Sequence, residues 1–319
     1  MISLNGALGN HQHANGISME LYGKGFVLGP DAGIGKVLYS GDDYKEYYSR
    51  FPAHNTVCVD GASDHPVMMT QHPFEVQFLK AAANASVSQV SFLEPETQSN
   101  QLRTNGIIKT EKGGYYVDVF RSKRQNGKDK FHDYFYHNLG QQMTLTAADD
   151  SDLNLQPTEE LAFAGGHLYA YSYIWDKHST YTDKDVKATF TTICPDGRKI
   201  DMTMWMKGAK DREVFRALSP VNMEYERLPK FMPYKVDEQP VLTYVARQHG
   251  DAWSNPFVAI YEPSDSNEPS EISKVEFFTP KEKDATGIKV TLKSGRIDTI
   301  VSTLQHYKVI SNGNILIEQ

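Results

Sequence analysis

The sequence predicts an all-β protein built as a multi-layer antiparallel β-sandwich with very little helix. Short segments rich in β-branched and aromatic residues recur along the chain, and many of them alternate apolar with polar residues. Turn signals separate them, such as Asn-Gly at 126–127 and at 312–313. So many strands without helices require stacked sheets or a closed barrel, and a length of 319 residues favours several layers of sandwich.

The predicted strands share this composition. They are ISMELY at 17–22, NTVCVD at 55–60, FEVQFL at 74–79, YYVDVFRS at 115–122, VKATFTTI at 186–193, KIDMTMWM at 199–206, EVFRAL at 213–218, VLTYVAR at 241–247, PFVAIYEP at 256–263, SKVEFFT at 273–279 and IKVTLKSG at 288–295.

One helical turn is predicted, over residues 42–51. Asp42 is a suitable cap, and Tyr44, Tyr47, Tyr48 and Phe51 recur at spacings of three and four. An ordered loop with the same residues packed against the sandwich is the alternative.

A change in composition suggests how the chain is divided. Charge and proline interrupt the strands between residues 205 and 240. We therefore expect a main β-sandwich domain at 1–215, which carries the candidate metal site, and a C-terminal β-sheet unit at 216–319 packed on it.

Composition and charge exclude several classes of function. The hydrophobic fraction is 39%, and no run approaches the ~18 apolar residues of a membrane helix, so we expect no membrane partner. A net charge of −7 argues against nucleic acid. The first ten residues lack the basic and apolar regions of a signal peptide, so none is predicted in this chain. The two cysteines set no disulfide framework, and Cys58 is predicted to be a buried free thiol.

The densest set of candidate ligands lies between residues 9 and 61. His11 and His13 are two residues apart, so in an extended backbone both imidazoles point to one face. Asp31 follows a glycine-bounded turn, and His54 follows a proline and an alanine. Imidazoles with a carboxylate suit a borderline metal such as zinc. The alternative is a set of strand and loop histidines that hydrogen-bond locally.

These residues carry a family resemblance. The run H-x-H-A-N-G-x-S-x-E-L-Y-G-K-G-x-x-L-x-P-D-A-G, the later E-Y-Y-S-x-F-P-A-H-N-T-V-x-V-D-G and the segment HDYFYHNLG at 132–140 together resemble the heparinase II/III-like polysaccharide lyases. The resemblance implies a supersandwich-like stack of sheets. It also implies an N-terminal α/α toroid of several hundred residues, which we expect this chain to lack.

The resemblance further implies roles for single residues. It makes His11 and, less directly, Tyr39 the matching catalytic positions, and it makes His13, Asp31 and His54 the zinc ligands. Two histidines and a carboxylate leave a fourth position open, as in a catalytic zinc site. Because a β-elimination needs no metal hydroxide, we favour a structural Zn²⁺ that joins three loops.

Two further residues are candidates for the surroundings of the site. Asn15 would point to the same face as His13 if the strand continues. It could then donate a hydrogen bond to one of the metal ligands. A turn asparagine before Gly16 explains it equally well. Tyr48 is a candidate cleft residue, and simple packing is its alternative.

The function implied is that of the β-sandwich portion of a lyase that cleaves a uronic-acid-containing, acidic polysaccharide by β-elimination. Without the toroid, which in the family supplies further catalytic groups, the isolated chain is expected to have little or no activity. A periplasmic or secreted location follows from the resemblance. The alternative is a non-catalytic carbohydrate-binding or assembly module that retained a structural zinc.

Overall fold

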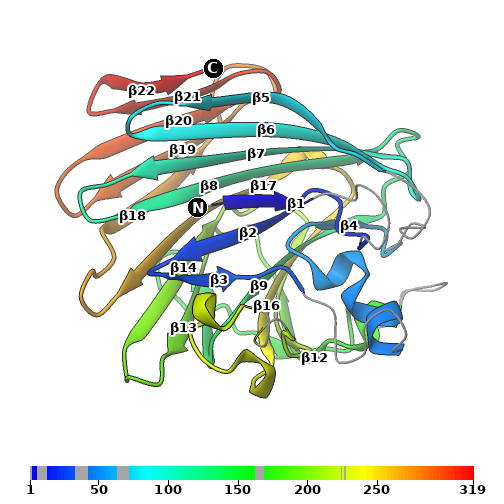
Figure 1. Cartoon of the computed structure of the whole chain (residues 1–319). Coiled ribbons are helices and arrows are strands. Elements are labelled where there is room, and N and C mark those ends of the chain that lie inside the picture. Colours follow the sequence, from blue (N-terminus) through cyan, green and yellow to red (C-terminus); the bar gives the residue numbers. More distant parts are fainter. Residues whose placement is uncertain are drawn as a thin grey trace.

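The structure, a computed structural model, describes residues 2–5, 13–32, 42–62, 72–161, 169–223, 225 and 228–319. Its strands form four antiparallel sheets of three, eight, six and five strands. The predicted all-β sandwich is therefore confirmed. Figure 1 shows the layers, with the C-terminal sheet stacked over one side of the long strands and the N-terminal strands lying on the other side. In these ranges no helix is long and apolar enough to cross a membrane.

The eight-stranded sheet is the central layer. In spatial order its strands are β10 (Gln142–Ala147), β13 (Val186–Ile193), β14 (Lys199–Met206), β17 (Ala252–Asp265), β8 (Gly114–Arg124), β7 (Ser99–Lys109), β6 (Ala85–Glu94) and β5 (Glu75–Ala81). Successive side chains of a strand point to opposite faces. Both faces of β8 are buried, since Tyr116 and Phe120 pack in one core and Val117 and Val119 in another. This explains the apolar run at 115–120, which only Asp118 interrupts.

The five-stranded sheet covers the outer face of the central layer. Its strands, in order, are β18 (Ile272–Phe278), β19 (Thr286–Leu292), β20 (Ile297–Ser302), β21 (Tyr307–Ser311) and β22 (Asn314–Glu318). Val117 and Trp205 of the central sheet pack there with Ile288 and Ile300. This separate sheet begins later than the predicted boundary at 215/216, because β17 and the strand before it pair inside the two larger sheets.

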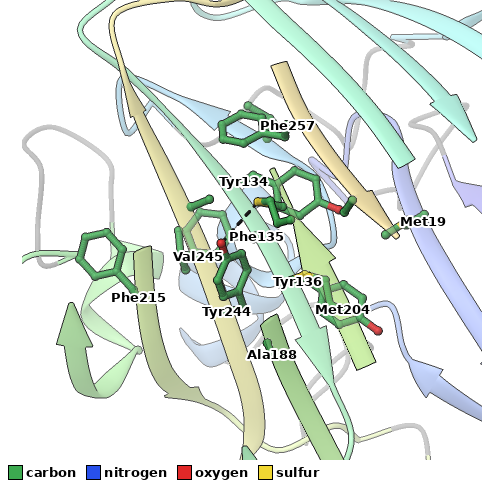
Figure 2. Packing of buried hydrophobic residues seen from close by; sticks show 14 of the residues in the cluster. Met19, Tyr134, Phe135, Tyr136, Ala188, Met204, Phe215, Tyr244, Val245 and Phe257 are labelled. Atoms are coloured by element: carbon green, nitrogen blue, oxygen red, sulfur yellow. Dashed lines mark hydrogen bonds between the residues drawn. The ribbon is translucent and has the colours of Figure 1, made fainter. Parts of the chain in front are cut away.

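Two further sheets cover the inner face. The six-stranded sheet has the order β11 (Gln156–Pro157), β12 (Trp175–Tyr181), β15 (Arg212–Ser219), β16 (Val241–His249), β9 (Phe131–Asn138) and β4 (Val57–Val59), and the three-stranded sheet has the order β1 (Ile2–Asn5), β2 (Ser18–Gly23) and β3 (Phe26–Gly29). Figure 2 shows Tyr134 and Tyr136 of β9 in this core with Phe257 and Met204 of the central sheet.

Helices are few and short in the described ranges. They are the π-helix η1 (Tyr44–Tyr48), the 3₁₀ helices η2 (Phe51–Ala53), η4 (Pro229–Phe231) and η5 (Val236–Glu238), and α1 (Tyr169–Ser172). The helical turn predicted at 42–51 is confirmed, and its aromatic residues are buried. The cap is corrected: the Asp43 carboxylate, not that of Asp42, accepts the hydrogen bond from the Tyr44 N–H, at 2.9 Å.

A buried ionic cluster ties the central sheet to the inner layer. The Arg103 guanidinium donates to both carboxylate oxygens of Asp118, at 2.9 and 2.7 Å. Its Nη1 also donates to the carbonyl oxygens of Ile17 and Asn55, both at 2.7 Å. Tyr134 donates its hydroxyl to Asp118 at 2.6 Å. Arg103 therefore fixes two inner-layer segments that flank the candidate ligands.

Candidate functional site

The structure brings together three of the residues that the sequence singled out. His13 lies just before β2, Asp31 follows β3, and His54 follows η2. The ring centroids of His13 and His54 are 5.2 Å apart, and Nδ1 of His54 is in close contact with Oδ1 of Asp31. His54 is fully buried, whereas the Asp31 side chain retains 23% of its exposure. Residues that are 41 positions apart in sequence thus form one cluster at the end of the inner layer.

Hydrogen bonds from backbone N–H groups hold the loops of this cluster to neighbouring elements. The Ala14 N–H donates to the Ser49 carbonyl at 2.9 Å, which ties the His13 segment to the end of η1. The Asp31 N–H donates to the Glu20 carboxylate at 3.1 Å, which joins the end of β3 to β2. Because each loop is bonded to a neighbouring element, the imidazoles and the carboxylate are held within narrow limits.

Gly16 is required for the approach of these loops. Its φ of +55° is a conformation that favours glycine, and a Cβ atom there would lie 2.9 Å from the ring of Phe51. Phe51 begins η2, which leads directly to His54. Gly16 therefore lets the segment after His13 pack against the helix before His54.

Burial and mutual electrostatics set the protonation states. Burial and the neighbouring His54 charge lower the pKa of His13 to about 4, although Asp31 opposes the change. Burial alone would raise the pKa of Asp31, but the charge and hydrogen bond of His54 outweigh it and lower that pKa to about 2. At neutral pH the cluster thus presents a neutral His13 and an ionised Asp31, the forms in which these groups bind a metal.

Asn55 and His137 belong to the same cluster, and the sequence analysis missed Asn55. The Asn55 amide nitrogen donates to the carbonyl oxygens of Met19 at 3.0 Å and Pro30 at 2.9 Å. Its amide oxygen accepts the His137 backbone N–H at 2.6 Å and lies 3.2 Å from His137 Nδ1. The sequence offers only its place directly after the candidate ligand His54, because its burial and its carbonyl partners are set by other segments.

His137 is fully enclosed and interacts electrostatically with the ligand candidates. Burial is the main cause that lowers its pKa to about 3, helped by His54 and opposed by Asp31. A small cavity of about 10 Å³ lies among Asp31, Tyr47, His137 and Asn222. This volume is about the space of one water molecule. His137 therefore lines the same enclosed space as the Asp31 carboxylate.

The premise behind the prediction for Asn15 is wrong. Residues 13–15 are not part of a strand, because β2 begins at Ser18, so strand alternation does not relate Asn15 to His13. Asn15 is buried directly before the turn at Gly16. Its Oδ1 has no hydrogen-bond partner within the described part of the chain. The turn interpretation accounts for its backbone, and a role behind the ligands stays a prediction.

The tyrosines of η1 differ in their relation to the cluster. Tyr44 packs edge-on against His13, with ring centroids 5.5 Å apart. Tyr48, the predicted cleft residue, donates its hydroxyl to the Val221 carbonyl at 2.7 Å, and burial raises its pKa. The Tyr48 hydroxyl is thus bonded to backbone, and its place in a cleft stays a prediction, whereas the ring of Tyr44 contacts a candidate ligand.

Two predicted catalytic residues are not described, and other histidine and tryptophan side chains lie away from the cluster. His11 and Tyr39 lie outside the described residues. His132 contacts Asp129 through Nε2 at 2.8 Å, so of the two histidines in HDYFYH only His137 faces the site. Trp205 is buried in the outer core, and Trp175 is 43% exposed on β12. Cys58 is a buried free thiol, as predicted.

The donor set at the cluster suits zinc, but its arrangement does not yet form a coordination sphere. Within the described ranges, no three histidine, cysteine, aspartate or glutamate side chains are arranged to hold a metal ion as they stand. Nδ1 of His54 contacts Asp31, while the buried Nε2 of His54 has no hydrogen-bond partner among the described residues. The free Nε2 and the adjacent imidazole and carboxylate fit a zinc ion in chemistry. Binding through all three groups requires Asp31 to turn away from His54.

Comparison with known proteins confirms the fold that the motifs implied and finds sequence similarity to a polysaccharide lyase. The chain has the fold of the β-sandwich region of the heparinase II/III-like polysaccharide lyases, and its sequence is similar to part of one polysaccharide lyase. That relative is an endo-acting ulvan lyase of Formosa agariphila, which is 31% identical over 294 residues. The match covers 80% of this chain and 32% of the relative, so the chain spans about a third of the relative's length.

Solved structures support the fold independently. A heparinase III structure with methylated lysines superposes with a TM-score of 0.56 at 10% identity, and covers 95% of this chain and 40% of its own. A second heparinase III structure has a TM-score of 0.52 at 13% identity, and covers 92% of this chain and 36% of its own. No family model matches the sequence.

Proposed function

We propose that this chain forms the β-sandwich wall of the cleft of a polysaccharide lyase that cleaves an acidic, uronate-containing polysaccharide by β-elimination. The observation that carries the proposal is the 31% identity to an endo-acting ulvan lyase over most of this chain, with the cluster of His13, Asp31 and His54 inside the shared fold. The fold alone would not suffice, because one fold hosts many functions.

A β-elimination makes three demands on the cleft. The C6 carboxylate of the uronate must be neutralised, the C5 proton removed and the leaving O4 oxygen protonated. Histidine and tyrosine can move the two protons when their surroundings adjust their pKa values. We assign this proton chemistry to His11 and Tyr39, on the resemblance of their motif positions. Neutralisation of the C6 carboxylate is assigned to the toroid of the longer relatives.

Zinc is proposed as a structural ion bound by His13, Asp31 and His54. When bound, it would supply positive charge that fixes three loops in one geometry. The residues themselves support the proposal: His13 is neutral at pH 7, Asp31 is ionised, and Nε2 of the buried His54 is unpartnered among the described residues. His11 is two residues from the proposed ligand His13 in the sequence.

The substrate proposed is ulvan or a chemically similar polyuronate. Ulvan is the polysaccharide in the description of the relative matched by sequence, whereas the heparinase III structures share only the fold at 10% and 13% identity. A net charge of −7 disfavours long-range attraction of a polyanion. Capture therefore depends on local groups in the cleft. A polymeric substrate also favours a periplasmic or secreted location.

A direct assay tests the proposal. The chain alone, and a form that includes an N-terminal toroid, are each incubated with ulvan, heparan sulfate, alginate and hyaluronan, and the unsaturated uronate product is followed by absorbance. We expect product from ulvan in the toroid-containing form and little or none from the chain alone. If the toroid-containing form binds ulvan but yields no unsaturated product, the alternative of a carbohydrate-binding module replaces the lyase proposal.

A further inference from the structure

The amide of Asn55 joins three segments of the candidate site. Its nitrogen donates to the Met19 carbonyl in β2 and to the Pro30 carbonyl beside Asp31. Its oxygen accepts from the backbone of His137 in β9. Asn55 itself follows His54 and is fully buried. The amide thus bonds every described segment that carries an imidazole or carboxylate of the cluster, except that of His13.

The hydrogen-bonding capacity of this amide is fully used. An asparagine side chain has two N–H donors and an oxygen with two lone pairs. The two carbonyl oxygens of Met19 and Pro30 can only accept, so the nitrogen must face them, and the oxygen must face the His137 N–H. The orientation of the amide is therefore determined by its partners, and no rotated alternative satisfies them.

This orientation also determines the tautomer of His137. The Asn55 Oδ1 lies 3.2 Å from His137 Nδ1 and can only accept. Nδ1 must then carry the proton in the neutral ring, and the lone pair is on Nε2. That Nε2 is buried without a hydrogen-bond partner in the described part of the chain, and the ring lines the cavity shared with Asp31.

Arg103 holds the backbone of Asn55 in place from the opposite side. Its Nη1 donates to the Asn55 carbonyl at 2.7 Å, and the Met19 N–H donates to the same oxygen at 3.2 Å. The guanidinium is itself fixed by Asp118. The central sheet therefore sets the position of the peptide group that joins Asn55 to Thr56, which is the geometry expected of a rigid support for a functional site.

We propose that Asn55 is the positioning residue of this site, and that His137, held by Asn55 as the Nδ1–H tautomer with Nε2 toward the Asp31 cavity, is a further member of it. Because the groups it orients include the proposed zinc ligands, the inference on metal affinity rests on the proposed function. Removing a partner that orients metal ligands typically weakens metal binding 10–100-fold.

The matched substitution is Asn55→Asp. It keeps the size of the side chain and the oxygen that faces His137, but it replaces the two-donor nitrogen by an oxygen that faces two carbonyls. We expect Asn55→Asp to bind zinc about 10–100-fold more weakly than the wild type in a competition titration with a chelator. The control is Tyr115→Phe, which removes a buried hydrogen bond of 2.8 Å to Asp298 beneath the five-stranded sheet and should leave zinc affinity unchanged.

The tautomer provides a readout that needs neither zinc nor a variant of Asn55. In nitrogen-detected NMR of the wild-type chain without metal, one histidine, identified by its absence in His137→Gln, should show a protonated Nδ1 and an unprotonated Nε2. A protonated Nε2 on His137 would overturn the inference, and so would a folded Asn55→Asp that binds zinc as tightly as the wild type. Absence of zinc binding in the wild type would instead contradict the proposed metal site, and the NMR result would still decide the role of Asn55.

Discussion

Replacing Arg103 by methionine tests how the buried ionic cluster supports the molecule. Arg103 is fully buried and makes four hydrogen bonds, two to the Asp118 carboxylate and two to the carbonyls of Ile17 and Asn55. In Arg103→Met, Asp118 keeps its bonds from Asn105 and Tyr134 but loses its cation while only 1% exposed.

The magnitude follows from that uncompensated charge. Breaking a buried ion pair from one side typically costs about 3–5 kcal/mol. Equilibrium unfolding in urea, followed by intrinsic fluorescence, should show this loss in the free energy of unfolding. The double variant Arg103→Met/Asp118→Asn removes the charge as well as its partner, so it should recover about 1 kcal/mol or more of the loss.

Two results would refute this reasoning. A loss below about 1 kcal/mol in Arg103→Met would mean that Asp118 does not depend on the cation, as at an exposed pair. A double variant less stable than the single one would mean that the charge on Asp118 is not the cause of the loss. Zinc affinity provides a second check, because the variant should weaken it if Arg103 fixes Asn55.

Three more predictions concern the site. Zinc should bind at about one ion per chain by elemental analysis. Zinc at a thousand-fold above Kd should stabilise the wild type and the half-buried His306→Ala control by about 4 kcal/mol relative to EDTA, whereas His54→Ala should show no such zinc-dependent gain, and an equal gain in His54→Ala would contradict its role as a ligand. In EDTA, stability should fall as pH drops from 6.5 towards 4, because below 6.5 the unfolded chain takes up protons at His13 and His137, whereas burial lowers both pKa values in the native state. His13 accounts for at most about 3 kcal/mol of this loss, and His13→Gln should reduce the loss, so a pH profile unchanged in that variant would contradict the assignment. Gly16→Ala should destabilise more than Gly25→Ala, since both residues have positive φ but only Gly16 has a ring 2.9 Å from the added Cβ; equal losses would show that the ring moves away freely.

Much of the fold could be predicted because apolar periodicity is strongest where strands are covered by sheets. The strands at 186–193 and 199–206 were predicted with the bounds that the structure gives. In contrast, β7 was not predicted, because many of its buried positions are polar and so show no apolar periodicity. Gln101, Arg103 and Asn105 are examples. Only their long-range partners explain why they are inside, and these partners cannot be read from local sequence.

The candidate site was predictable in composition but not in detail. Motif resemblance singled out His13, Asp31 and His54, which the structure brings together. Strand alternation failed for Asn15, because residues 13–15 form a turn segment before Gly16 rather than a strand. The role of Asn55 was not predicted, because it depends on backbone carbonyl groups of two other segments. The sequence does not show which carbonyl groups lie near a side chain.

The central claim is tested most directly by the rate of unsaturated uronate formation from ulvan, measured for His11→Ala and His13→Ala in a form that includes an N-terminal toroid. His11→Ala should keep its zinc and its melting temperature but lose turnover by about 10²–10⁴-fold, as expected for a missing proton-transfer group. His13→Ala should lose zinc first, and activity as a consequence. If both variants keep zinc and full turnover, the assigned roles of the two histidines are contradicted. The proposal of a lyase site on this sandwich is then contradicted as well.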